Sequence, residues 1–243
     1  MNGTQGRYDF PLRPQSPVAV EDPKEHPVSV SDTVLLAFAN LATPTIANAL
    51  DDVEFEGVMQ GLAQMVPGTR CVGRAVTVRE ITGKRGDFAS EEFQVGHMMD
   101  AANAGDILVI DNGGQCVSTF GGLATLAAKV KGIGGLVADG GVRDREEMVE
   151  HKFPVFARHM TPLTGRSRLA VTGINQPISC GGVRVRPGDI IVGDGSGVVC
   201  IPAEHAAKVA ELAARYAKDD AQAATELAKG LSFRDAMAKF RRI

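Results

Sequence analysis

Short apolar strands alternate with helical segments in the middle of this 243-residue chain, and this alternation constrains the fold more than any other feature. Strands are expected over about 106–111, 133–139 and 153–157, with helices over about 121–131 and 144–151 between them. If the strands are parallel, the loops that follow the first two leave from carboxyl ends, where ligands bind in open α/β sheets. Gly121-Gly122 and Arg143-Asp144 would then face one crevice.

The glycine pair Gly121-Gly122 precedes the first of these helices. Apolar residues recur there at helical spacing and define one apolar face: Leu123, Leu126, Ala127 and Val130. Gly132 is placed for a left-handed C-terminal cap. Unpaired N–H groups and the positive end of the helix dipole at the helix start favour a carboxylate or phosphate, and the missing Cβ lets a ligand come close. The alternative is that the glycines only permit a tight turn.

Arg143-Asp144 follows the second strand, and Glu147 lies one helical turn further on. With the glycine pair across the crevice, the pattern indicates an anion site beside a metal site. Taken alone, an adjacent Arg-Asp is equally typical of a solvated ion pair or of a carboxylate at a helix start. Their joint position at the carboxyl ends of two strands favours the functional interpretation.

Gly122, Arg143-Asp144 and Glu147 at this spacing resemble the signature of the RraA-like family. That family includes divalent-metal pyruvate aldolases that cleave 4-hydroxy-4-methyl-2-oxoglutarate and 4-carboxy-4-hydroxy-2-oxoadipate, and a branch of ribonuclease regulators. The similarity covers residues 32–217. Further segments resemble the family in the same order: 41–50, 73–78, 104–111, 153–158 and 187–198.

The resemblance assigns roles to these positions. Asp144 and Arg143 are the expected catalytic residues; Asp144 also resembles the metal-site aspartate and Arg143 the arginine that contacts the pyruvyl group. The expected carboxylate cradle is the backbone of Gly121, Gly122, Leu123 and Ala124. Glu147 would assist at the metal, or it is a plain surface carboxylate. The family also draws a carboxylate from a neighbouring subunit, for which three residues are unranked candidates: Asp194, Glu204 and Glu211.

The implied function is a lyase: a class II aldolase dependent on Mg²⁺ or Mn²⁺ that cleaves a 4-hydroxy-2-oxo acid to pyruvate and a carbonyl product, with oxaloacetate decarboxylation through the same enolate. A hard cation and Arg143 suit stabilisation of that enolate, whereas the nearby lysines, Lys129 and Lys131, lie too far from the glycines for a Schiff base. The alternative is a non-catalytic protein-binding regulator of ribonuclease activity, although Asp144 favours the enzyme branch. A methyltransferase is disfavoured because no Gly-x-Gly nucleotide loop is evident. The resemblance also implies a homotrimer or homohexamer.

Composition agrees with a cytoplasmic enzyme. The chain is 44% hydrophobic and 23% charged with a net charge of −3, which argues against nucleic acid as a partner. No apolar run approaches the ~18 residues that span a membrane, and no signal-peptide pattern is present. The four cysteines show no Cys-x-x-Cys spacing and are expected to be reduced thiols: Cys71, Cys116, Cys180 and Cys200.

The expected organisation is an N-terminal arm (1–30), an RraA-like catalytic domain (31–218) and a C-terminal helical extension (219–243). By resemblance the fold is α/β: a layered β/β/α swivelling-type domain that contains the βαβαβ unit, with helical extensions at both ends. Helices are expected from Val34, from Thr43-Pro44 with Thr43 as the cap, over 94–104, over 203–218 and from Ser232. The charged stretch 83–93 is expected to be a loop that borders the site.

Overall fold

Four parallel strands form the centre of the protein. The structure, a computed structural model, describes residues 30–240, so the predicted arm over 1–30 lies outside the described residues except for Val30. The four strands are adjacent in the sheet: β3 (Cys71–Thr82), β4 (Ile107–Asp111), β6 (Gly135–Val142) and β7 (Val155–Met160). Helix α4 (Gly122–Lys131) connects β4 to β6, and α5 (Arg145–Glu150) connects β6 to β7. The predicted βαβαβ unit is therefore confirmed.

The parallel strands are buried on both faces. Every residue of β6 is buried, and β4 is buried up to Asp111. Strands of this kind appear in a sequence as nearly continuous apolar runs, which is why they could be recognised. In the register of β4 and β6, Asp111 lies opposite Asp139, so the loops that follow the two strands leave at the same edge of the sheet.

The sheet continues beyond β3 as an antiparallel layer. Its strands are β11 (Ile190–Asp194), β12 (Gly197–Ile201) and β1 (Val58–Met59). Side chains of this layer, including Ile191 and Val198, share one hydrophobic cluster with Val137 and Phe156 of the parallel strands, so the two parts pack face to face. Five short strands complete the β structure of the described residues: β2 (Ala63–Gln64), β5 (Ser118–Phe120), β8 (Leu169–Ile174) and the paired β9 (Ile178–Cys180) and β10 (Val183–Val185).

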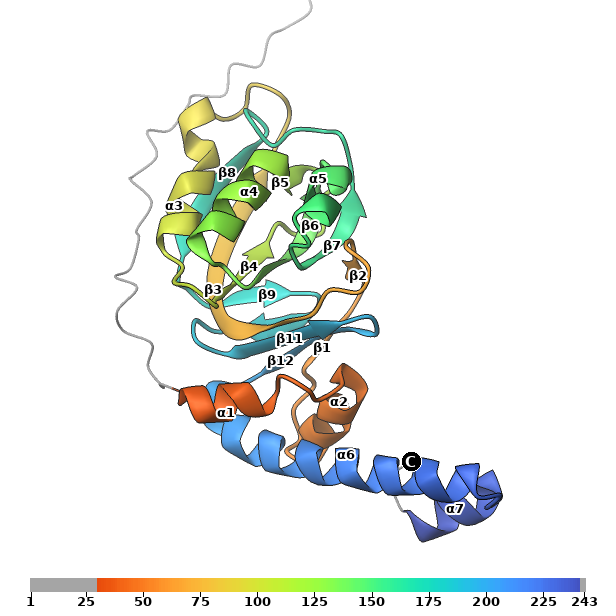
Figure 1. The fold of residues 1–243 in the computed structure, drawn as a ribbon. Coiled ribbons are helices and arrows are strands. Elements are labelled where there is room, and N and C mark those ends of the chain that lie inside the picture. The colour runs from red at the N-terminus through yellow and green to blue at the C-terminus, as the bar shows by residue number, and fades with distance from the viewer. Residues whose placement is uncertain (1–29, 241–243) are drawn as a thin grey trace, which may run out of the picture.

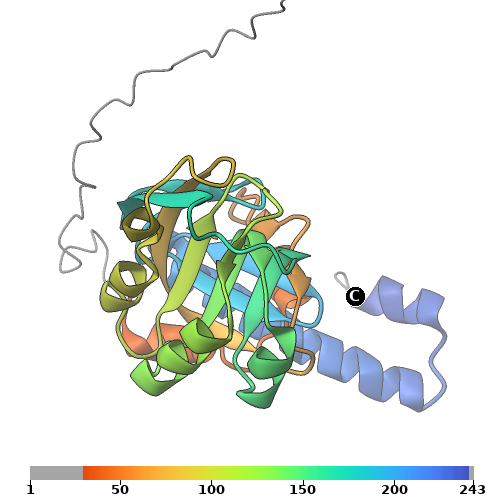
Figure 2. The same ribbon diagram turned by 90° about the horizontal axis from the view of Figure 1, so that it is seen from above.

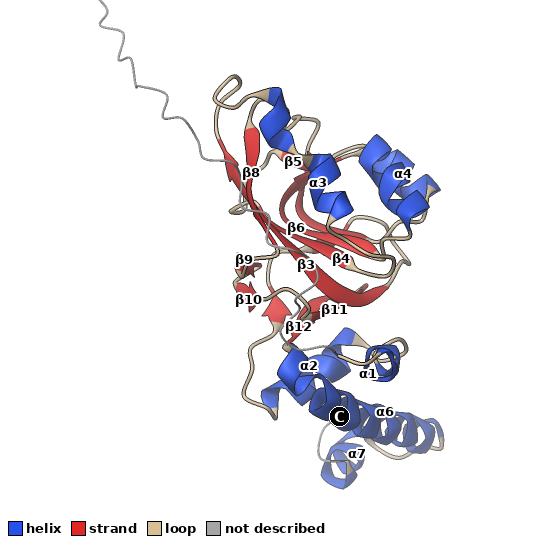
Figure 3. Ribbon diagram, turned by 90° about the vertical axis from the view of Figure 1, so that its left-hand side faces the viewer, coloured by secondary structure: helices blue, strands red, loops and turns tan. Residues whose placement is uncertain are grey.

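Helices cover the outer face of each layer (Figures 1 and 3). Helices α3 (Val95–Asp100), α4 and α5 lie on the parallel strands. On the other side, α1 (Asp32–Ala37), α2 (Thr43–Asp51) and α6 (Ala206–Ala228) pack on β11 and β12. The layered β/β/α fold is confirmed, with a further helical layer at the far side. The end of α6 and helix α7 (Phe233–Lys239) extend beyond the layers (Figure 2).

The apolar face of α4 does not pack on the sheet. Helix α4 and its left-handed cap at Gly132 (φ 81°) are confirmed. However, Leu123, Leu126 and Val130 are 84%, 43% and 80% exposed. The small residues Gly122, Thr125 and Ala128 face the sheet instead. Apolar periodicity identified the helix, but it did not identify which side approaches the strands.

Three predicted helix ends differ from the structure. Thr43 is not the cap of α2: Ala42 precedes the helix, and the Thr43 amide and hydroxyl both donate to Asp194, at 2.8 and 2.7 Å. The helix predicted over 203–218 begins as a 3-10 turn, η2 (Ala203–His205), and α6 continues without a break to Ala228. The helix predicted over 94–104 is reduced to α3. Ser232, by contrast, caps α7 as predicted, accepting a hydrogen bond from the Asp235 amide at 3.1 Å.

The four cysteines are free thiols, as predicted, and three of them are buried: Cys71, Cys180 and Cys200. Burial raises the pKa of Cys71 to about 12, so this thiol is inert. Among the helices that the structure describes, none is long and apolar enough to cross a membrane. The boundaries of the predicted arm, catalytic domain and C-terminal extension stay predictions.

Candidate active site

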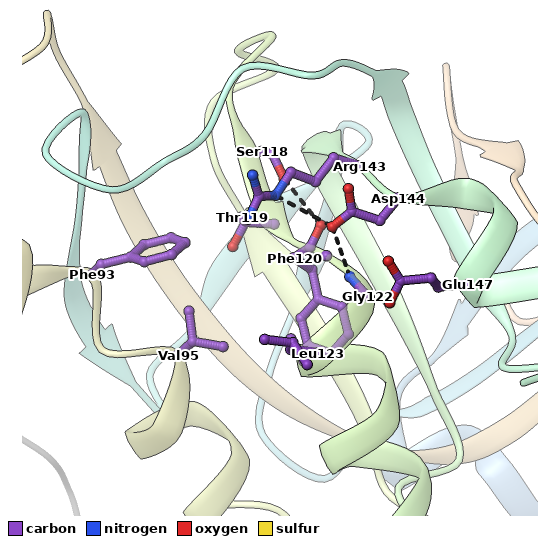
Figure 4. A pocket seen from close by; sticks show the side chains of 12 residues that line it. Phe93, Val95, Ser118, Thr119, Phe120, Gly122, Leu123, Arg143, Asp144 and Glu147 are labelled. Carbon is purple, nitrogen blue, oxygen red and sulfur yellow. Dashed lines mark hydrogen bonds and ion pairs between the residues drawn. The ribbon is translucent and has the colours of Figure 1, made fainter.

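A cavity of about 640 Å³ lies where α4 begins, beside the loop that follows β6. Figure 4 shows Arg143, Asp144 and Glu147 on one side of this cavity, and Phe93 and Val95 on the opposite side. All seven predicted site residues line it: Gly121, Gly122, Leu123, Ala124, Arg143, Asp144 and Glu147. Residues from two crossover connections therefore meet at one place, as the parallel strand order requires.

Asp144 connects the two halves of the site. Its Oδ2 accepts a hydrogen bond from the Gly122 amide at 2.9 Å and lies 3.5 Å from Nε of Arg143. Asp144 precedes α5 with φ 61° and ψ 50°, a left-handed conformation that aspartate adopts more readily than most residues. The Arg143 amide donates to the Phe120 carbonyl at 3.0 Å, so this loop is held against the start of α4.

The two glycines make room for the charged side chains. A Cβ on Gly121 would lie 2.6 Å from Oδ2 of Asp144, and one on Gly122 would lie 1.9 Å from Oε2 of Glu147. Neither glycine has a positive φ that would itself demand glycine. The missing Cβ atoms therefore allow the side chains of Asp144 and Glu147 to approach the helix start. This is a second role, in addition to the close approach of a ligand that the sequence predicted.

The backbone N–H groups at the start of α4 divide into two sets. The Gly122 amide donates to Asp144, and the Thr125 amide donates to the Gly121 carbonyl at 2.9 Å. The amides of Leu123 and Ala124 have no acceptor among residues 30–240. These two donors, with the positive end of the helix dipole, are the part of the predicted carboxylate cradle that remains open to an anion.

Asp144 and Glu147 are the carboxylates that line the cavity and could bind a divalent cation. Within the described part of the chain, no group of three or more His, Cys, Asp or Glu side chains is placed to hold a metal ion. Two carboxylates nevertheless fit Mg²⁺, which commonly takes one or two carboxylates and fills its other positions with water and substrate oxygens. The donor set is all oxygen, which suits Mg²⁺ or Mn²⁺ better than a softer metal.

The three candidates for a carboxylate from a neighbouring subunit do not line this cavity. Asp194 accepts from Thr43 and pairs with Arg70 at 3.2 Å. Glu204 pairs with Arg186 at 2.8 Å, and Glu211 pairs with Lys208 at 3.2 Å. Each therefore already has a partner in its own chain, and their role across an interface stays a prediction.

Glu80, which no local sequence pattern indicates as a site residue, lies directly behind the cavity wall. Glu80 is only 5% exposed, and its Oε1 accepts a 2.5 Å hydrogen bond from the hydroxyl of Thr119, a lining residue. Its Oε2 is buried with no partner among the described residues. Burial raises the pKa of Glu80 to about 8, although the Thr119 hydrogen bond opposes this. Glu80 is therefore a neutral acid at pH 7.

The apolar wall of the cavity comes from the stretch before β4. Phe93 ends the 3-10 helix η1 (Ser90–Phe93), and Val95 begins α3. The prediction that the stretch 83–93 borders the site is confirmed by Phe93, although its last four residues form η1 rather than a loop. Sequence reasoning did not single out Val95, Ser118 or Thr119, because nothing in their local pattern distinguishes them from core residues.

Comparison with known proteins places this architecture. The fold and the cavity define an α/β protein whose charged side chains gather at the start of a crossover helix. A family model described as RraA-like (Aldolase/RraA) matches residues 43–200. The chain therefore belongs to the RraA-like family.

Individual proteins of similar sequence or structure agree with this family assignment. A Halalkalibacterium halodurans protein is 35% identical over 184 residues, which are 75% of this chain and 83% of that protein; it carries the name 4-hydroxy-4-methyl-2-oxoglutarate aldolase as a provisional assignment. An uncharacterised Pseudomonas syringae protein of solved structure has a TM-score of 0.77 at 28% identity, covering 86% of this chain and 98% of its own. RraAS2 of Streptomyces coelicolor, described as an unusual member of the RNase ES inhibitor RraA family, shares the fold, with a TM-score of 0.69 at 21% identity over 84% of this chain and 98% of its own.

Glu80 generates a prediction about stability. Because the pKa of Glu80 rises from 4.5 to about 8 on folding, the folded state holds a proton that the unfolded state loses. Its stabilising effect is complete below pH 4.5 and is lost as the pH rises to about 8. Glu80→Gln keeps a hydrogen-bond acceptor for Thr119 but cannot ionise. As the pH rises through this range, the free energy of unfolding of the variant, measured with urea, should increase by a few kcal/mol relative to that of the wild type.

The control for this measurement is Glu150→Gln, which removes an exposed carboxylate on α5. Its unfolding free energy should follow the wild type at each pH. Parallel pH curves for wild type and Glu80→Gln would mean that Glu80 is ionised in the folded protein.

Proposed function

We propose that this protein is a divalent-metal-dependent class II pyruvate aldolase, a lyase that cleaves a 4-hydroxy-2-oxo acid to pyruvate and a carbonyl product. The observation that carries the proposal is the convergence of Arg143, Asp144 and Glu147 on the open amides at the start of α4. The name carried by the Halalkalibacterium halodurans relative supports the same reaction class. The experiment that tests it is pyruvate release from a panel of 4-hydroxy-2-oxo acids.

The residues of this chain fit the charge changes of the reaction. As the C3–C4 bond breaks, the C4 hydroxyl gives its proton to solvent and becomes the carbonyl of the released product. The electron pair of the broken bond moves toward the C2 oxygen as an enolate, which then takes up a proton at C3 to give pyruvate. The amides of Leu123 and Ala124 would hold the substrate carboxylate at the helix start. Arg143 would direct its terminal N–H groups at the C2 oxygen, because no residue among 30–240 accepts from them. Mg²⁺ or Mn²⁺ bound by Asp144 and Glu147 would supply Lewis-acid stabilisation of the same oxygens.

The residues that line the cavity also bear on whether the reaction uses a metal ion or a lysine Schiff base. No lysine lines the cavity among the described residues, and Lys129 and Lys131 lie at the opposite end of α4. A Schiff-base mechanism therefore has no amine at hand. Oxaloacetate decarboxylation passes through the same enolate, so the same residues would catalyse it as a second activity. The three buried thiols fit a reducing compartment, and we place the enzyme in the cytoplasm.

We further propose that the protein is a homotrimer or homohexamer whose sites lie between subunits. The exposed apolar face of α4, formed by Leu123, Leu126 and Val130, begins at the cavity itself. Contiguous apolar surface of this kind is typical of an interface, and a neighbouring subunit there would bring further side chains to Asp144 and Glu147.

The alternative is a non-catalytic regulator that binds a ribonuclease. The same apolar face of α4 would then receive the partner protein, and Asp144 would only fix the loop. The panel of substrates distinguishes the two functions, because a regulator releases no pyruvate with any of them.

The first prediction of this proposal concerns the metal. Oxygen ligands hold a hard cation loosely, so chelator should abolish pyruvate release and added Mg²⁺ or Mn²⁺ should restore it. The measurement is a coupled assay of pyruvate before and after metal stripping, with the coupling enzyme tested separately as the control. Full turnover in the stripped protein would contradict the metal-dependent mechanism.

The second prediction concerns assembly. Light scattering should give three or six times the mass of one chain, and Leu126→Glu should lower that mass because it places a charge in the apolar face of α4. Val58→Glu, at a 50% exposed apolar residue of β1, is the matched control and should leave the mass unchanged. A wild-type protein that is monomeric and active at assay concentration would exclude a site completed between subunits.

The third prediction concerns Arg143. Arg143→Lys keeps the charge but loses the planar pair of donors, so kcat should fall by roughly two to three orders of magnitude. Stability should change by less than about 1 kcal/mol, since the Arg143–Asp144 pair is substantially exposed. Arg145→Lys is the matched control, because Arg145 donates to the Met65 carbonyl and does not line the cavity. Unchanged kcat in a folded Arg143→Lys protein would favour the regulator.

A further inference from the structure

A second cavity, of about 490 Å³, is lined by three arginines and three hydroxyl residues. Arg85 lies between β3 and η1, and Ser90 is the first residue of η1. The other four come from the connection between β7 and β8: Thr164, Arg166, Ser167 and Arg168. Every lining side chain can donate hydrogen bonds, and none is a carboxylate. The proposed aldolase mechanism uses none of these residues.

The positive charge of this cavity is not balanced within the described chain. Arg85, Arg166 and Arg168 make no ion pair with any carboxylate in residues 30–240. Within residues 30–240, their only hydrogen bonds from side-chain atoms are Nε of Arg166 to the Ser90 hydroxyl at 3.1 Å and Nη1 of Arg168 to the Thr164 carbonyl at 3.3 Å. Each guanidinium carries five N–H donors, so most donors here have no acceptor in the part of the chain that the structure describes.

Two acids close in sequence to this cavity accept hydrogen bonds from backbone amides of their own turns. Asp87 accepts from the Lys84 amide at 2.6 Å, and Glu92 accepts from the Ala89 amide at 2.6 Å. Both carboxylates therefore stabilise their own turns. Gathering three like charges around one hollow is unfavourable unless an anion offsets it, and guanidinium forks suit the oxygens of phosphate and carboxylate groups.

The two loops that carry the arginines are fixed to each other. The Gly83 amide donates to the Arg168 carbonyl and the Gly86 amide to the Ser167 carbonyl, both at 2.8 Å. Ser167 has a left-handed backbone (φ 62°), an uncommon conformation that these contacts hold in place. The three guanidinium groups are thus presented by a frame whose backbone is already set, which lowers the cost of ordering them around a ligand.

We propose that Arg85, Arg166 and Arg168 form a binding site for a small, multiply charged oxyanion, separate from the cavity of Arg143 and Asp144. The ligand class is defined by closely spaced anionic oxygens, which a phosphorylated metabolite and a polycarboxylate share. The overall net charge of −3 and the small size of the cavity disfavour a nucleic-acid backbone.

The site is also placed to act on the candidate active site. Ser90 lines the arginine cavity and begins η1, whose last residue, Phe93, lines the cavity of Arg143. Thr164 of the arginine cavity pairs with Ser118 of the other cavity through a β-bridge. An anion that draws Arg85 and Arg166 together would therefore change the position of η1 and of Phe93, so we expect it to alter KM more than kcat if the aldolase proposal holds.

Calorimetric titration of the full chain with pyrophosphate, inorganic phosphate and citrate at low ionic strength tests the site without relying on activity. At least one anion should bind with a Kd below about 1 mM, and Arg166→Gln and Arg168→Gln should each weaken it at least about tenfold. Arg184→Gln, at an exposed arginine of β10, and Arg143→Lys should leave the affinity unchanged. Preference for pyrophosphate or for citrate distinguishes the phosphorylated ligand from the polycarboxylate.

Three results would overturn the proposal. One is the absence of binding by any of the three anions up to about 10 mM, a concentration that would detect even a very weak site. Another is binding that survives in both folded glutamine variants, verified by circular dichroism. The last is binding that disappears in Arg143→Lys, which would assign the anion to the other cavity. Because each readout is a binding heat, failure here leaves the aldolase proposal untouched.

Discussion

The hydrogen bond from the Gly122 amide to Asp144 is the contact on which the candidate active site depends. At 2.9 Å it joins the start of α4 to the loop after β6, two places that are 22 residues apart in the chain. Parallel pairing of β4 with β6 brings both to one edge of the sheet, and the left-handed backbone of Asp144 turns its carboxylate back toward the helix. Without this contact, the loop would still be joined to the start of α4 through the Arg143 amide, which donates to the Phe120 carbonyl, but the Asp144 carboxylate would no longer be fixed beside the open amides of Leu123 and Ala124.

The same contact explains why glycine occurs twice at this helix start. Cβ atoms at Gly121 and Gly122 would occupy the space of the Asp144 and Glu147 carboxylates. The Gly122 amide donates to Asp144 of the same chain. The amides of Leu123 and Ala124 are therefore the ones left for a ligand. Close approach of protein side chains, rather than backbone conformation, is thus the constraint on these two positions.

Much of the fold could be predicted because its signals are local. Buried parallel strands appear as apolar runs, and the βαβαβ order alone predicts that Gly122 and Arg143-Asp144 lie close together. Glu80 could not be found in this way, since its partner Thr119 lies 39 residues away and its raised pKa arises from burial. The exposed face of α4 was equally hidden, because small residues, Thr125 and Ala128, pack closely against the strands while Leu123 and Val130 face outward. Apolar periodicity predicts that a helix forms, but it does not predict which face of the helix packs on the sheet.

The two cavities differ most in how their positive charge is balanced. Around Arg143, the carboxylates of Asp144 and Glu147 lie at the same wall, so under the proposed mechanism a cation would enter together with an anionic substrate. Around Arg85, Arg166 and Arg168, none of the lining residues that the structure describes is a carboxylate, and the proposed anion needs no cation. The proposed dependence on a divalent cation at one cavity and the proposed indifference to it at the other would both follow from this difference in side-chain charge, and chelation would separate the two binding events in a single protein.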